Sequence, residues 1–122
     1  MGAQKSNKKE KMSIERKYRK GEILFREGEP PREIFLIKEG KVEIIKGDKR
    51  LAILDAGEFL GEMAVLDGRP RSATARALED TVVLTLDRDE LLKKMEDDPM
   101  LGALITTLIR RLREADRRLA ER

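Results

Sequence analysis

The segment from Phe59 to Ala77, with the sequence FLGEMAVLDGRPRSATARA, contains several residues that could bind an anion together. Gly61 and Glu62 stand at the start of a short helical run, where free backbone N–H groups and the local dipole attract negative charge. Arg71 follows nine residues after Glu62, and its planar guanidinium can hold the same anion with parallel hydrogen bonds. The residues after it are small and leave their backbone donors open to a ligand, namely Ser72 and Ala73.

The carboxylate of Glu62 limits the kinds of ligand that this site could bind. A carboxylate does not bind a phosphate, so its place beside Arg71 is explained if it accepts a hydrogen bond from a neighbouring hydroxyl, such as a ribose 2′-OH. The alternative is an ordinary surface salt bridge between Glu62 and Arg71. The glycines and small residues around the pair favour a site for a small phosphate ester that carries a sugar hydroxyl.

The residue types that the chain lacks argue against an enzyme. The sequence contains neither histidine nor cysteine, which removes the commonest general base, the commonest metal ligand and the thiolate nucleophile. The acidic residues Glu58 and Glu62 lie on one short loop and do not resemble the opposed acids of a glycosidase. We therefore expect no catalysis, no metal site and no disulfide.

Charge is distributed unevenly along the 122 residues, although the net charge is only +3. Residues 21–98 hold nineteen acidic and thirteen basic side chains, whereas both ends are basic. We interpret residues 1–13 as a disordered basic tail, and the acidic centre should repel nucleic acid. No segment is apolar enough for a membrane span or a secretory signal, so we expect a cytoplasmic chain without a direct nucleic-acid or membrane partner.

Between residues 14 and 86 the apolar residues occur in short runs separated by turn residues. The dipeptide Gly47-Asp48 between two of the runs predicts a tight hairpin with glycine at its first central position. Several short strands at near-regular spacing are typical of an all-β sandwich or barrel. The runs are Ile23–Phe25, Ile34–Ile37, Val42–Ile45, Leu51–Leu54 and Val82–Leu86.

Residues 87–122 have a helical pattern instead. Asp87, followed by an acid three residues later, predicts a capped helix that ends near Met95. The pair Asp98-Pro99 predicts the start of a longer second helix. The apolar residues of this helix form a heptad-like seam, which could pack on the chain's own strands or pair with a second copy. They are Leu101, Ile105, Leu108, Leu112, Ala115 and Leu119.

Three segments resemble, in order, the motifs of the cyclic nucleotide-binding domain family. They are Gly21–Gly28 (GEILFREG), Phe35–Val42 (FLIKEGKV) and Gly61–Thr74, which is similar to the phosphate cassette of that family. The resemblance covers about Ile14 to Arg122. It implies that a cyclic nucleotide is the ligand.

The fold implied by the resemblance is mainly β with α-helices, in one domain over residues 14–122. An eight-stranded jelly-roll β-barrel would occupy residues 14–86, with a short helix in the phosphate cassette, and helices would occupy residues 87–122. Arg71 would bind the exocyclic phosphate and Glu62 the ribose 2′-hydroxyl. Backbone amides would bind phosphate oxygens, and two apolar side chains would form a wall beside ribose and base. These residues are Gly61, Met63, Ala64, Ser72 and Ala73 for the amides, and Ile44 and Leu51 for the wall.

The resemblance leaves two nucleotides, cAMP and cGMP. In this family a hydroxyl residue at the position of Ser72 can contact guanine, but it also occurs in bacterial cAMP receptors, and we favour cAMP. Asp116 on the last helix could bind either base or could be an ordinary solvated residue. The resemblance further suggests that Leu66 transmits movement of the cassette to a hinge near Asp98-Pro99, so that the last helix closes over the base.

The function we expect is that of a regulatory ligand sensor. Transcription factors of the family carry a helix-turn-helix domain after the long helix, whereas this chain stops at Arg122. The sensor would therefore signal to an unknown protein partner, with residues 99–122 as a candidate homodimer contact. Two alternatives stay open: a ligand-free interaction or dimerisation scaffold, and the sensor fragment of a longer transcription regulator.

Overall fold

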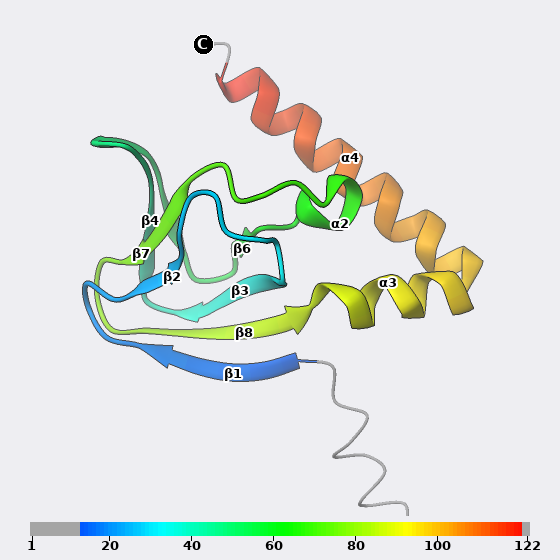
Figure 1. Ribbon diagram of the computed structural model, residues 1–122, viewed down its shortest axis with the longest axis horizontal. Coiled ribbons are helices and arrows are strands. Elements are labelled where there is room, and N and C mark those ends of the chain that lie inside the picture. The colour runs from blue at the N-terminus through cyan, green and yellow to red at the C-terminus, as the bar shows by residue number, and fades with distance from the viewer. Residues whose placement is uncertain (1–12, 121–122) are drawn as a thin grey trace, which may run out of the picture.

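The computed structural model describes residues 13–120, without the side chains of residues 64–65 and 116–120 (Figure 1). The predicted basic tail, residues 1–13, lies outside the described residues except for Ser13, which begins the first strand. In chain order the elements are β1 (Ser13–Tyr18), β2 (Ile23–Phe25), β3 (Glu33–Glu39), β4 (Lys41–Lys46), β5 (Lys49–Asp55), β6 (Phe59–Leu60), α2 (Ala64–Asp67), β7 (Thr74–Ala77), β8 (Thr81–Asp87), α3 (Arg88–Asp97) and α4 (Pro99–Ala120).

The strands form two four-stranded antiparallel sheets with the orders β1-β8-β3-β6 and β2-β7-β4-β5. The predicted mainly β fold with eight strands is confirmed, but the predicted jelly-roll barrel is not closed, because no pairing between described strands joins the two sheets. The edge strands β2 and β6 are short, with three and two residues, and each pairs with a single neighbour. The other two edge strands, β1 and β5, also pair on one side only, so neither pair of edges forms the ladder that closure would need.

The main hydrophobic core lies between the two sheets. Alternate residues of a strand point to opposite faces, and the buried residues of the two inner faces meet in one cluster. Both sheets contribute to it: Phe35, Ile37, Leu60 and Val83 from one, Val42 and Ala75 from the other. The predicted apolar runs therefore correspond to strands of a two-layer sandwich.

The turn between β4 and β5 confirms the hairpin that the sequence predicts. Lys46 pairs with Lys49 across a two-residue loop. Gly47 has a φ of 61°, while Asp48 keeps a negative φ. Positive φ at the first central residue alone is the pattern of a type II′ turn, which requires glycine there.

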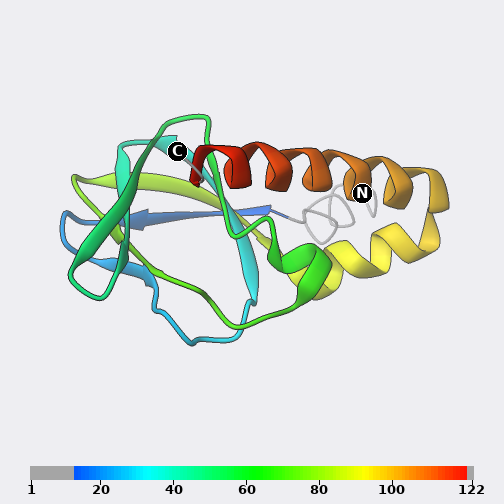
Figure 2. The ribbon, with the colours of Figure 1, turned by 90° about the horizontal axis from the view of Figure 1, so that it is seen from above.

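The two predicted helices are confirmed, and their caps are those that the sequence indicates. The carboxylate of Asp87 accepts a hydrogen bond from the Glu90 amide at 3.0 Å at the start of α3. α4 then turns back along α3 and passes α2 (Figure 2). The two helices come close together at the turn between α3 and α4, since a Cβ at Gly102 would lie 2.9 Å from the carbonyl oxygen of Met95.

A second, smaller cluster attaches the helices to the sheets. Its buried members are Ile34 of β3, Leu91 of α3 and Ile109 of α4. Leu66 of α2 and Ile105 of α4 pack against them. The cluster thus joins α2, α3 and α4 to the end of one sheet.

The predicted seam of α4 divides between two environments. Leu101 and Ile105 are half-buried, whereas Leu108 and Leu112 are exposed. Met100 and Leu104 extend the exposed row at a spacing of four residues. α4 therefore buries one apolar stripe within the chain and leaves an adjacent stripe open. None of the helices within residues 13–120 combines the length and the apolar character needed to cross a lipid bilayer.

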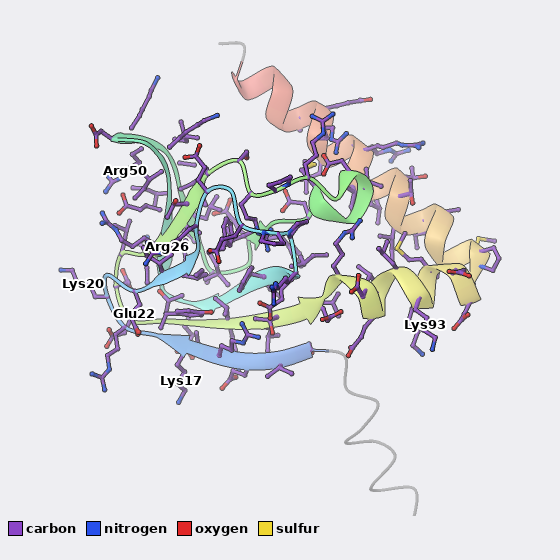
Figure 3. The ribbon with its side chains drawn as sticks, viewed as in Figure 1. Lys17, Lys20, Glu22, Arg26, Arg50 and Lys93 are labelled. Carbon is purple, nitrogen blue, oxygen red and sulfur yellow. The ribbon has the colours of Figure 1, made fainter. Side chains whose placement is uncertain are left out.

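Glu43 is a buried carboxylate on the outer side of the β2-β7-β4-β5 sheet. Its side chain accepts hydrogen bonds from Arg76 at 2.6 and 2.8 Å and from Arg50 at 2.9 Å. Arg50 lies beside the β4–β5 hairpin (Figure 3). The hydrogen bond from Arg76 is the main reason that the pKa of Glu43 falls below its usual value; Arg50 acts in the same direction, and burial opposes both.

Glu43→Gln should lower the stability of the domain at neutral pH by about 1–3 kcal/mol, because charge-assisted hydrogen bonds from two arginines are weakened. Since the folded-state pKa is lowered, the stabilisation is complete above the unfolded-state pKa. It is lost as pH falls through the folded-state value. Urea unfolding from pH 7 down to pH 3 should show the wild-type advantage shrinking below about pH 4. Glu96→Gln, at an exposed position of α3, is the control, and a wild-type advantage that does not change with pH would contradict the prediction.

Candidate functional site

A cavity of about 480 Å³ opens on the inner side of the β2-β7-β4-β5 sheet, where α2 and α4 approach it. This volume lies within the usual range for sites of small ligands. We call it the site cavity. It is lined by Phe25, Ile44, Leu54, Phe59, Leu60, Gly61, Glu62, Met63, Asp67, Arg69, Pro70, Arg71, Ser72, Ala73 and Arg113.

The backbone of Arg71 is fixed by the loop between β2 and β3. Its N–H donates to the carbonyl oxygen of Glu29, and its carbonyl oxygen accepts from the amide of Gly28, both at 2.8 Å. Nearby, the amide of Glu27 donates to the hydroxyl of Thr74 at 3.0 Å. The motif that contains Gly28 thus positions the arginine of the cassette, although the two segments are far apart in the sequence.

The guanidinium of Arg71 is buried, and the residue is only 8% exposed. Nη2 donates to the carbonyl oxygen of Glu33 at 2.6 Å, and Cζ lies 4.2 Å from the ring centroid of Phe25. Nη1 lies against Gly61, where φ is +79° and an added Cβ would overlap it. A further donor, Nε–H, is buried and has no hydrogen-bond partner in the described part of the chain.

Burial lowers the pKa of Arg71, while the carboxylates of Glu33, Glu29 and Glu62 raise it. A guanidinium nevertheless stays protonated in proteins. Among the side chains that the structure describes, Arg71 forms no ion pair, and its close contacts are a ring face and a backbone carbonyl. A buried positive charge held in this way attracts an anionic ligand.

The other cassette residues surround Arg71 as the sequence predicts, with one difference in local structure. Gly61, Glu62 and Met63 are half-buried and line the site cavity, and Glu62 is close enough to influence the pKa of Arg71. They form a bend and turn, so that the helix α2 begins at Ala64 and not at Gly61. The side chain of Ala64 lies outside the described residues.

Beyond Arg71, the chain supplies both a polar and an apolar part of the lining. Ser72 is exposed and Ala73 is buried, and both line the site cavity. They lead directly into β7, whose first residue is Thr74. The cavity therefore brings together seven of the nine predicted site residues.

The predicted apolar wall is partly different in the structure. Ile44 lines the site cavity, but Leu51 is 51% exposed and does not. The β4–β5 ladder shifts register between Ile44 and Ile45, so that Leu51 is the extra residue of a bulge. Leu54 takes the place beside Ile44, because it lies on the same face as Ala52, which pairs with Ile44.

α4 contributes a site residue that the sequence analysis missed. Arg113 lines the cavity and donates to the Asp67 carboxylate at 3.0 Å and to the Met63 sulfur at 3.4 Å. The sequence around Arg113 does not mark it as a site residue. Arg113 lines the cavity because α4 crosses α2 at this point, and the sequence of α4 does not show where that crossing lies. Asp116 belongs to α4, and its side chain lies outside the described residues.

Comparison with known proteins agrees with this geometry. The family model of the cyclic nucleotide-binding domain matches residues 15–98. The chain is 39% identical over 107 residues to the Cyclic AMP receptor protein of Thermus thermophilus, an alignment that covers 83% of this chain and 50% of that protein. The chain thus spans about half the length of this curated relative.

Solved structures give the same result. The Catabolite Activator Protein of Thermus thermophilus superposes with a TM-score of 0.71 at 37% identity, covering 88% of this chain and 54% of that one. The EAL enzyme Bd1971 in its cAMP-bound form has a TM-score of 0.63 at 34% identity, covering 84% and 29%. Its cGMP-bound form has a TM-score of 0.62 at 33% identity, covering 82% and 28%.

The family model covers more than half of the chain, and the residues of its cassette meet at one cavity. This chain belongs to the cyclic nucleotide-binding domain family.

Proposed function

We propose that this chain is a regulatory sensor that binds one cyclic nucleotide in the site cavity. The observation that carries the proposal is Arg71, a buried cation that lines the cavity and has an unpartnered Nε–H within the described residues. A phosphate would supply both the missing negative charge and the missing acceptor. The carboxylate of Glu62 lines the same cavity, and we assign it to the ribose 2′-hydroxyl.

The remaining contacts follow from the lining of the cavity. Backbone amides of the cassette would bind the phosphate oxygens, because the side chains beside them are small or absent. The apolar wall beside ribose and base would consist of Ile44 and Leu54, in place of the predicted pair with Leu51. The amide donors in this proposal are those of Gly61, Met63, Ala64, Ser72 and Ala73.

We favour cAMP as the nucleotide, because the chain is similar to a cyclic AMP receptor protein. cGMP is the alternative, because one structural neighbour has been solved with either nucleotide. We propose a sensor and not a catalyst, since the cavity offers guanidiniums and carboxylates but no histidine or cysteine, which the sequence lacks. A cytoplasmic location, and a domain that begins near residue 14, stay predictions of the sequence.

The signal, in this proposal, passes from the cassette to α4 by two contacts. Leu66 of α2 packs against the cluster that contains Leu91 and Ile109, and Arg113 of α4 holds Asp67 of α2. A ligand that draws the cassette toward Arg71 would therefore move α4 as well. The movement of α4 would pass to a protein partner, and a second copy of this chain is the candidate that the surface of α4 supports.

The exposed stripe of α4 supports a homodimer. Met100, Leu104, Leu108 and Leu112 recur every four residues and leave a continuous apolar row in solvent. The same row on a second copy would be self-complementary about a two-fold axis. Burial of such side chains is the usual source of helix-pair stability.

Arg71→Ala should weaken cAMP binding about tenfold to a hundredfold, because a charge-assisted hydrogen bond to phosphate contributes about 1.5–3 kcal/mol. Arg71→Lys keeps the charge but loses the planar fork, so it should also bind more weakly than wild type. Isothermal titration calorimetry with cAMP and with cGMP measures both effects and the nucleotide preference. Adenosine, which lacks the phosphate, is the control ligand and should not distinguish the variants. A wild-type protein that binds neither nucleotide would contradict the proposal and favour the scaffold alternative.

Arg113→Ala should weaken the tie between α4 and α2. A half-exposed ion pair contributes up to about 1 kcal/mol, so amides of α4 should exchange with deuterium about two- to fivefold faster in the variant. Addition of the nucleotide should slow the exchange of α4 in wild type and slow it less in the variant. Arg110→Ala, at an exposed position of the same helix, is the matched control. Exchange of α4 that does not respond to nucleotide would refute the proposed route of the signal.

Leu108→Glu should convert a dimer to a monomer, because it places a charge in the middle of the exposed apolar row. Sedimentation velocity of wild type and variant measures the change. Ala103→Glu introduces the same charge on the other flank of α4 and should leave the dimer intact. A wild-type protein that sediments as a monomer at every concentration would rule out this contact.

A further inference from the structure

The ring of Phe25 forms a platform beneath the guanidinium of Arg71. Cζ of Arg71 lies 4.2 Å from the centroid of the Phe25 ring and 5.9 Å from that of Phe35. We propose that Phe25 is a positioning residue, whose ring face holds the Arg71 guanidinium in the orientation that receives the phosphate. The inference rests on the proposed function and adds to it the residue that prepares the phosphate contact before the ligand arrives.

A ring face suits this task better than a carboxylate. It attracts the cation through its quadrupole, but it neither neutralises the charge nor occupies an N–H group in the guanidinium plane. The other restraints act at the edges of that plane, where Nη2 donates to the carbonyl of Glu33 and Nη1 lies against Gly61. Together they fix the guanidinium from below and from two edges, and they leave the buried Nε–H without a partner among the described residues.

The position of Phe25 depends on an irregularity in β2. Ile23 pairs with Arg76 of β7, and a regular ladder would place Phe25 opposite Thr74, on the same face as Ile23. Instead the register shifts, and Phe25 pairs with Ala75, which is fully buried on the inner face. Bulges re-aim side chains in this way. The irregularity turns Phe25 toward the site cavity, which it lines.

The platform is itself held by the core. The rings of Phe25 and Phe35 are tilted by 36°, with centroids 5.7 Å apart. Phe35 is 1% exposed and belongs to the main core cluster, against which Phe25 packs. The buried core thus orients the Arg71 guanidinium through two aromatic side chains in a tilted contact, and the binding step does not have to create this orientation.

The competing explanation is that Phe25 is an ordinary part of the core. A packing role predicts that any large apolar side chain will serve and that its loss will act on stability alone. A positioning role predicts an effect that passes through Arg71. The two explanations therefore differ in a double-mutant cycle and in the spectrum of Arg71 itself.

The first measurement uses the ligand-free protein. The Nε–H resonance of Arg71, in a ¹H–¹⁵N spectrum of the 122-residue chain, should be displaced by the ring current of Phe25. In Phe25→Leu the resonance should return toward the chemical shift of an arginine Nε–H that is not near an aromatic ring. In Phe25→Tyr, which keeps an aromatic face, it should stay displaced. An Arg71 resonance at the usual position in wild type would overturn the stacking itself, whether or not a nucleotide binds.

The second measurement is calorimetric titration with cAMP. Phe25→Leu should bind about tenfold more weakly, because a desolvated cation–π contact of this size is lost, while Phe25→Tyr should stay within about twofold of wild type. In the Arg71→Ala background, Phe25→Leu should have no further effect. Tyr18→Leu removes another aromatic ring that packs on the same core and lies outside the site cavity, and it should lower stability without changing affinity.

Two outcomes would overturn the inference. One is an unchanged affinity in a folded Phe25→Leu protein, with circular dichroism to verify the fold. The other is an equal loss with and without Arg71, which would mean that Phe25 acts by packing. If wild type binds no nucleotide, the proposed function fails first, and the resonance of Arg71 still decides whether the platform exists.

Discussion

The guanidinium of Arg71 is charged, buried and unpaired with any carboxylate in the described chain, and the surrounding structure accommodates it. A buried ion is unfavourable unless other groups replace its hydration. Here the replacement is incomplete: a carbonyl and an aromatic face stabilise the cation, and one N–H stays unsatisfied. Residues from β2, β3 and the cassette are all committed to this arrangement. The buried guanidinium of Arg71 therefore favours the binding of an anion, which would supply the interactions that the protein itself does not provide.

Local features of this chain could be predicted because they depend on residues that are close in sequence. The glycine of the β4–β5 turn is required by a positive φ, and the cap of α3 needs only Asp87 and the amide three residues later. The presence of Glu62 and Arg71 at one cavity was also predicted from the residue types and from the resemblance. Ligand-binding groups of this kind can be predicted because they occur in short sequence motifs.

The incorrect or missing parts depend on register and on distant contacts. Leu51 and Leu54 are three residues apart and lie on opposite faces of β5, and the apolar run alone does not show that the face of Leu54, which pairs with Val42, is the inner one. Closure of the barrel depends on whether the edge strands of the two sheets pair with each other, and the apolar runs of the sequence carry no information about that pairing. Arg113 reaches the cavity only because the corner at Gly102 sends α4 across α2. The sequence of α4 alone does not predict the direction in which this helix crosses α2.

The absence of a side chain at Gly61 limits which substitutions the site can accept at residues 61 and 71. Residues 61 and 71 occupy one shared volume, since a Cβ on the first would overlap Nη1 of the second. The two positions are therefore not independent in evolution or in design. A substitution that adds bulk at residue 61 displaces the arginine, whereas a shorter side chain at residue 71 removes only this overlap and leaves the φ of +79°, which still favours glycine. A chain that loses this arginine therefore still has a reason in its backbone to keep the glycine.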